Sequence, residues 1–146
     1  MIGVNDIYIL DDIANNEVRK KGKYEDVFAY TDNVLFPQNI PYYKNIVEKC
    51  IQNSIKLILC SVTPNNHDFR NGKDYRNYYI CKLNDELKKI AKKNNISYVD
   101  YVEALIDENG LLSSSYSFDR LHPNPKGYAI MERILKPYLE KELKND

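Results

Sequence analysis

Several residue types are scarce in this chain, and each scarcity excludes a class of protein. The chain has only three cysteines, at unrelated spacings, which excludes a disulfide framework and a zinc site and favours a reducing compartment. No run approaches the ~18–20 apolar residues of a membrane span. The N-terminus also lacks the basic-then-apolar layout of a signal peptide. We therefore expect a cytoplasmic protein with no membrane span.

The chain also has no excess of either charge: its net charge is zero, because 21 acidic side chains balance 21 basic ones. A neutral chain without a basic stripe is not expected to bind nucleic acid. The remaining composition is that of a globular protein, with 43% hydrophobic residues in a chain of 146. That length normally forms one domain with a useful core, and there are no repeats or linkers. We expect residues 1–146 to form a single domain.

Two apolar runs predict buried strands. Residues 55–62 are nearly continuously apolar, and residues 96–102 form a second such run. Runs of this kind are typical of strands covered on both faces of a parallel sheet. Residues 11–40 begin polar and are predicted to form a loop with at most one helical turn, at the rim of a site.

Helical periodicity separates these strands. Helices are expected to begin at Pro41, to span residues 75–93, and to run from Lys126 or Gly127 to the end of the chain. Pro137 is expected to kink or split the last helix. This alternation predicts an α/β fold, a doubly wound parallel sheet with right-handed crossovers.

The stretch Asp119-Arg120-Leu121-His122 pairs a carboxylate with one of only two histidines. A carboxylate on one imidazole nitrogen leaves the other free to take a proton from a hydroxyl, as in hydrolase triads. Pro123 and Pro125 favour a turn after His122, so the pair is expected in the loop before the last helix. The spacing alone is also explained by a turn-forming Asp119 and a surface His122, and on its own it favours that interpretation. The other histidine, His67, is expected in a solvated loop or in contact with substrate.

The longer string Asp119 to Tyr128 resembles the last sequence block of the SGNH hydrolases, also called GDSL-type lipases and esterases. That block reads like D-G-L-H-P-N-x-x-G-Y, and Arg120 stands where the family prefers glycine. Gly3-Val4-Asn5-Asp6 matches the family's third block, G-x-N-D. The resemblance implies a flavodoxin-like doubly wound sheet of five parallel strands. This chain would hold the C-terminal portion, with two complete strands and a stub at Met1-Ile2.

The resemblance also implies an activity and a role for each matching residue. His122 would be the general base, Asp119 would orient it, and Asn5 would donate its amide to an oxyanion. The reaction would be serine ester hydrolysis on a small acyl or acetyl ester, carried on a sugar or lipid, without a metal or cofactor. Asn5 is also a natural turn former within its block.

The family's nucleophile block, G-D-S, occurs nowhere in the 146 residues. The serines of the chain do not sit on a glycine-flanked turn after an apolar strand. The sequence therefore leaves two further possibilities open: a catalytically inactive truncated fragment, and a non-catalytic binding module on the same fold. Since the missing strands would bare an apolar sheet edge, self-association through that edge is also expected.

Overall fold

The computed structural model describes residue 10, residues 25–66 and residues 74–144. The elements in these ranges are α2 (Glu25–Tyr30), η2 (Thr31–Leu35, a π-helix), α3 (Phe36–Gln52), β1 (Ile58–Cys60), α4 (Tyr75–Lys93), β2 (Ser97–Val99), α5 (Val102–Leu105) and α6 (Pro125–Lys144). None of the helices found in these ranges has both the length and the apolar character needed to cross a membrane.

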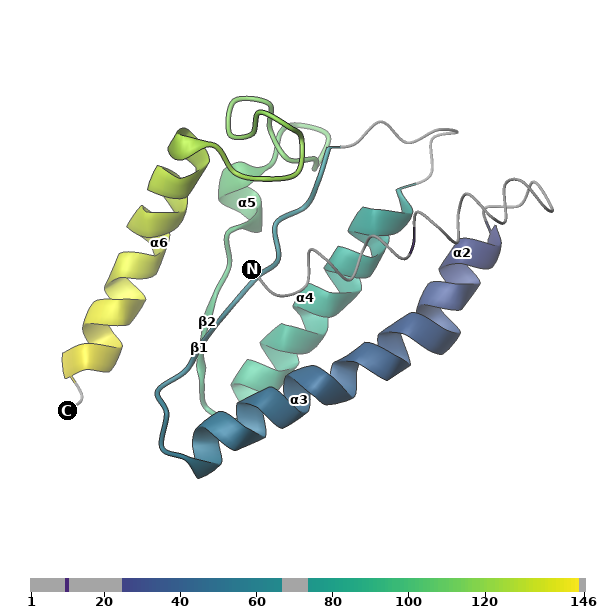
Figure 1. The fold of residues 1–146 in the computed structure, drawn as a ribbon. Helices are drawn as coiled ribbons and strands as arrows, with labels where there is room; N and C mark the ends of the chain where they lie inside the picture. Colours follow the sequence, from purple (N-terminus) through teal and green to yellow (C-terminus); the bar gives the residue numbers. More distant parts are fainter. Residues whose placement is uncertain (1–9, 11–24, 67–73, 145–146) are drawn as a thin grey trace.

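Strands β1 and β2 lie side by side in parallel, with Ile58 opposite Ser97 and Cys60 opposite Val99. Helix α4 connects them and packs against one face of the pair, with α3 beside it (Figure 1). Helix α6 packs against the other face (Figure 1). The predicted α/β class with a parallel sheet between helical layers is confirmed.

The helix that leads into β1 begins much earlier than predicted. Residues 25–52 are helical throughout, so the prediction of a loop up to residue 40 is wrong for residues 25–40. Pro41 does not open the helix but lies inside α3, while Pro37 occupies its first turn, where proline is tolerated. The segment is helical because Val27, Leu35 and Ile40 are buried in the core. The π-helical turn lies between Val27 and Ile40, where the amide of Phe36 donates to the carbonyl of Thr31.

Both strands are shorter than the apolar runs that predict them, because each preceding helix ends in a left-handed turn. Ser54 has φ 54°, and the amide of Ile55 donates to the carbonyl of Cys50. Asn95 has φ 55°, and the amide of Ile96 donates to the carbonyl of Ala91. These are Schellman-type helix ends. They hold Ile55 and Ile96 at the ends of helices rather than in the strands.

The later helices lie close to their predicted positions. Helix α4 spans the predicted residues 75–93, and the side chain of Asp74 caps it by accepting from the amide of Asn77. Burial raises the pKa of the Asp74 carboxyl. Helix α6 starts at Pro125 and passes through Pro137 as one element, so the predicted split does not occur.

Two apolar clusters form the core. The first lies between the α2–α3 segment, α4 and the end of β1, and includes Leu10, Val62 and Tyr79. The second lies between β2, α5 and α6 and includes Val99 and Leu105. Together they fix the carboxyl ends of both strands, where the loops that carry polar side chains begin.

Candidate active site

The Asp119–His122 pair lies in a narrow loop just before α6. Ser117 and Pro123 face each other across an isolated antiparallel bridge, which closes the loop between them. We call residues 117–123 the base loop. The hydroxyl of Ser117, which is buried, donates to Asp119 Oδ1 at 3.3 Å. Backbone pairing between its two ends and the contact of the Ser117 side chain therefore hold the base loop in place.

Asp119 orients both the backbone and the ring of His122. Its Oδ1 accepts from the amides of Leu121 and His122 at 3.0 and 2.7 Å. Its Oδ2 lies 2.6 Å from Nδ1 of the imidazole. With a carboxylate on Nδ1, the proton of a neutral imidazole resides there and Nε2 is left as an acceptor. This is the arrangement that a general base requires.

The same contacts hold the carboxylate in its charged form. Hydrogen bonds from the backbone amide and the ring of His122, and from the amide of Leu121, keep the pKa of the Asp119 carboxyl well below its usual range. Both side chains remain accessible, with 62% of His122 and 55% of Asp119 exposed. Solvent therefore screens the pair, and its contribution to stability is small.

We expect the carboxyl of Asp119 to stay ionised when the pH falls below the ordinary aspartate value of 3.8. Because its folded pKa is depressed, the stability it contributes is complete above the unfolded value and disappears as the pH falls through the folded value. A ¹³C NMR titration of the carboxyl carbon measures this midpoint. In His122→Ala the midpoint should rise towards 3.8, and a wild-type midpoint at or above 3.8 would contradict the assignment.

Arg120, at the tip of the base loop, adopts a left-handed conformation with φ 66°. A residue with a Cβ atom is strained there, which explains why glycine suits this position in the related sequence block. The carbonyl of Arg120 accepts from the amide of Asn66 at 2.8 Å. The strained tip is thus tied to a second loop.

That second loop follows β1 and is anchored by two asparagines that the sequence analysis did not identify. The side chain of Asn66 donates to the carbonyl of Leu112 at 3.1 Å. Asn65 is fully buried and exchanges hydrogen bonds with Asn77 of α4. Consecutive asparagines directly after a buried strand and a proline are the signal that could have located this loop.

Asn124 joins the base loop to α6. Its Oδ1 accepts from the amide of Gly127 at 3.0 Å, which caps the helix, and its Nδ2 donates to the carbonyl of Ser115 at 3.1 Å. A Cβ atom on Gly127 would lie 2.7 Å from the carbonyl oxygen of Tyr116, so only glycine fits without movement. Asn followed by Pro125 at the first helical position is a recognisable helix start.

The other predicted site residues are placed differently. Asn5 and His67 lie outside the described residues. In the described part of the chain, no serine hydroxyl hydrogen-bonds to His122. Ser61 accepts from the amide of Tyr101 at 2.9 Å, and Ser97 donates to Glu142 at 2.7 Å. These hydroxyls are occupied by contacts that stabilise the fold.

The sequence as a whole matches the profile of the GDSL-like lipase/acylhydrolase family over residues 1–130. The chain belongs to this family. A GDSL-like lipase from Bacteroides thetaiotaomicron has a similar structure, with a TM-score of 0.64 and 33% identity. That match covers 73% of this chain and 53% of the lipase chain. The predicted membership in the SGNH or GDSL-type hydrolases is confirmed.

A second structural neighbour is a catalytic mutant of an acetylxylan esterase from Geobacillus stearothermophilus. Its TM-score is 0.58 at 18% identity, and the match covers 93% of this chain and 56% of the esterase chain. The parallel α/β fold of the SGNH type is confirmed by these similarities. The chain spans about half the length of the structures it matches. No curated protein sequence gives a significant match.

Proposed function

We propose that this chain provides the acid–base half of a serine ester hydrolase site. His122 is the general base, Asp119 orients it, and Asn5 donates its side-chain amide to the oxyanion. The observation that carries the proposal is the 2.6 Å contact between Asp119 Oδ2 and His122 Nδ1, in a chain of the GDSL family.

In the proposed reaction, Nε2 of His122 removes the proton of a serine hydroxyl as the serine oxygen attacks the ester carbonyl. The carbonyl oxygen becomes an oxyanion, which accepts a hydrogen bond from Asn5. The imidazolium then protonates the departing alkoxide, which leaves as the alcohol. Water, deprotonated by the same imidazole, attacks the acyl-serine carbonyl. As the acid is released, the imidazolium returns the proton to the serine oxygen, which restores the hydroxyl and the neutral base. One preplaced oxyanion donor typically lowers such a barrier by ~3–4 kcal/mol.

We place the nucleophilic serine on a segment that corresponds to the unmatched part of the similar structures. The family block G-D-S is absent from the 146 residues, and the match leaves about half of the neighbouring lipase uncovered. For the substrate we propose a small acetyl ester on a carbohydrate. The similarity to the acetylxylan esterase supports this choice.

A fused protein tests the proposal. The N-terminal segment of the B. thetaiotaomicron lipase, up to the region that this chain matches, is joined to residues 1–146; we call that segment the lipase segment. The fused protein should hydrolyse an activated acetate ester and react with a fluorophosphonate probe, whereas the unfused chain should do neither. A fused protein that melts cooperatively yet neither turns over the ester nor reacts with the probe would overturn the proposal.

A further inference from the structure

The base loop carries an exposed aromatic ring beside the catalytic pair. Phe118 directly precedes Asp119, and 85% of it is exposed, the largest exposed fraction among the large apolar residues that the structure describes. Leu121, in the same loop, packs against the first core cluster instead. Isolated apolar side chains are common on protein surfaces, so the position of Phe118 relative to His122 decides what the ring can do.

Phe118 and His122 lie on the same face of the base loop. Ser117 and Pro123 form the antiparallel bridge, so Phe118 and His122 are the next pair inward along the two arms of the loop. Side chains alternate between the two faces along an extended chain. The burial of these residues follows that alternation, since Ser117 and Pro123 are buried whereas Phe118 and His122 are exposed. Opposed residues of this kind have Cβ atoms about 5 Å apart, so the phenyl ring borders the imidazole.

The loop that presents this ring is fixed on several sides. The hydroxyl of Ser117 donates to Asp119, which in turn accepts from the backbone amide of His122. The carbonyl of Arg120 accepts from the amide of Asn66. A ring held on such a support loses little conformational freedom when a ligand covers it, and this favours binding.

The role of His122 determines which part of the ester lies near Phe118. In the proposed reaction, the imidazolium gives its proton to the oxygen of the leaving alcohol, which must therefore lie about 3 Å from Nε2. The group attached to that oxygen then passes over the loop face that the two side chains share. The acyl group lies on the other side of the bond that breaks.

We propose that Phe118 binds the alcohol part of the ester by stacking its ring on a pyranose. The identity of this alcohol rests on the proposed function, which supplies a carbohydrate ester. The face of a phenyl ring is electron-rich, and it attracts the weakly positive C–H groups on the face of a sugar ring. A phenyl ring offers no hydrogen bond, so Phe118 selects alcohols by their shape and their apolar surface. It therefore favours a sugar ester over an ester of a very small alcohol.

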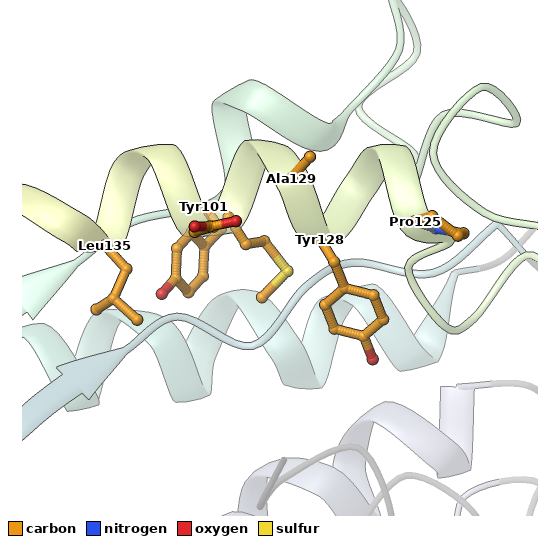
Figure 2. Close-up of a pocket in the computed structure, with 7 residues that line it drawn as sticks. Tyr101, Pro125, Tyr128, Ala129 and Leu135 are labelled. Carbon is orange, nitrogen blue, oxygen red and sulfur yellow. The ribbon is translucent and has the colours of Figure 1, made fainter.

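Tyr128 is a second exposed aromatic residue near the base loop, but it lies on a different surface. It is 54% exposed and lines a hollow of about 690 Å³ along α6. In Figure 2 it points to the same side of α6 as Leu135 and Tyr101. Tyr128 therefore provides a matched control, because it is an exposed ring outside the loop face that Phe118 shares with His122.

Binding of the alcohol product tests the inference without any turnover. Xylotriose is titrated into the full chain and, separately, into the fused protein, while NMR follows the ring signals of Phe118 and His122. Both rings should respond with one saturable dissociation constant. Phe118→Ala should raise this constant at least about fivefold, whereas Phe118→Tyr, which keeps a ring, should stay within about twofold. Tyr128→Ala should also stay within about twofold.

Two outcomes of this titration would overturn the inference. One is the absence of a saturable response in both proteins. The other is equal binding by Phe118→Ala and the parent, including the case in which Tyr128→Ala alone weakens binding and so places the sugar in the α6 hollow. Because Phe118 is 85% exposed, Phe118→Ala should melt at nearly the parent temperature, so that a loss of binding is not a loss of folding.

Hydrolysis by the fused protein, which carries the lipase segment, separates this inference from the proposed function. Phe118→Ala should lower kcat/KM for an acetylated xylo-oligosaccharide by about tenfold, mainly through a higher KM. Methyl acetate should be hydrolysed within about twofold of the parent rate, because its alcohol is too small to reach the ring. Equal losses on both esters would contradict a contact with the alcohol. If neither ester is hydrolysed but xylotriose binding still depends on Phe118, only the proposed function fails.

Discussion

Replacing His122 with alanine in the fused protein is expected to lower kcat for an activated acetate ester by ~10⁴–10⁶-fold. Without the imidazole, the serine proton has no acceptor at Nε2, and the leaving alkoxide has no proton donor. KM should change little, because the imidazole acts mainly in the transition state. Initial rates over a range of ester concentrations separate kcat from KM.

Two controls distinguish lost chemistry from lost structure. The side chain of His122 is 62% exposed, so its removal should leave the melting temperature nearly unchanged. Added imidazole should restore part of the activity of His122→Ala, because it can occupy the vacated position. A loss of less than about tenfold, with normal folding, would show that His122 is not the base.

Replacing Asp119 with asparagine is expected to lower kcat by ~10⁴-fold. The amide oxygen can still accept from the backbone of Leu121 and His122, so the base loop keeps its shape. The amide nitrogen, however, donates to Nδ1 and moves the ring proton to Nε2. That nitrogen can then no longer accept the proton of the serine.

Asp107 offers a matched control for this substitution. Its Oδ1 also accepts from two backbone amides, those of Asn109 at 2.8 Å and Leu111 at 3.1 Å, but among the described residues no histidine bonds to it. Asp107→Asn should therefore leave kcat within about twofold of the parent protein. Equal losses in the two variants would indicate that Asp119 acts only through the fold of its loop.

Local patterns in the sequence were sufficient to predict some elements but not others. Helix α4 could be placed because its apolar spacing and its flanking residues agree. The helix over residues 25–40 was not predicted, because the sequence alone does not distinguish a proline that opens a helix from one inside it; Pro41 lies inside α3. Their helical state depends on burial of Val27 and Leu35 against distant residues. The strand limits were missed because Ser54 and Asn95 adopt left-handed conformations that few non-glycine residues adopt.

The candidate site also contains contacts that local sequence patterns predict and contacts that they do not. Asp119 and His122 are three residues apart, so a tight loop can bring them together without help from the rest of the fold. Asn66, by contrast, contacts Arg120 and Leu112, which lie more than forty residues later in the sequence. Asn66 and Leu112 are separated by 46 residues. No local pattern indicates such a contact, because it depends on how the carboxyl ends of the strands are arranged.

The Asn66 contacts have a mechanical consequence. They connect the end of β1 to the tip of the base loop, so that the thermal amplitude of His122 is governed partly by the stiffness of a strand. Any displacement of the end of this strand is therefore passed, through two hydrogen bonds of Asn66, to the loop that carries the imidazole.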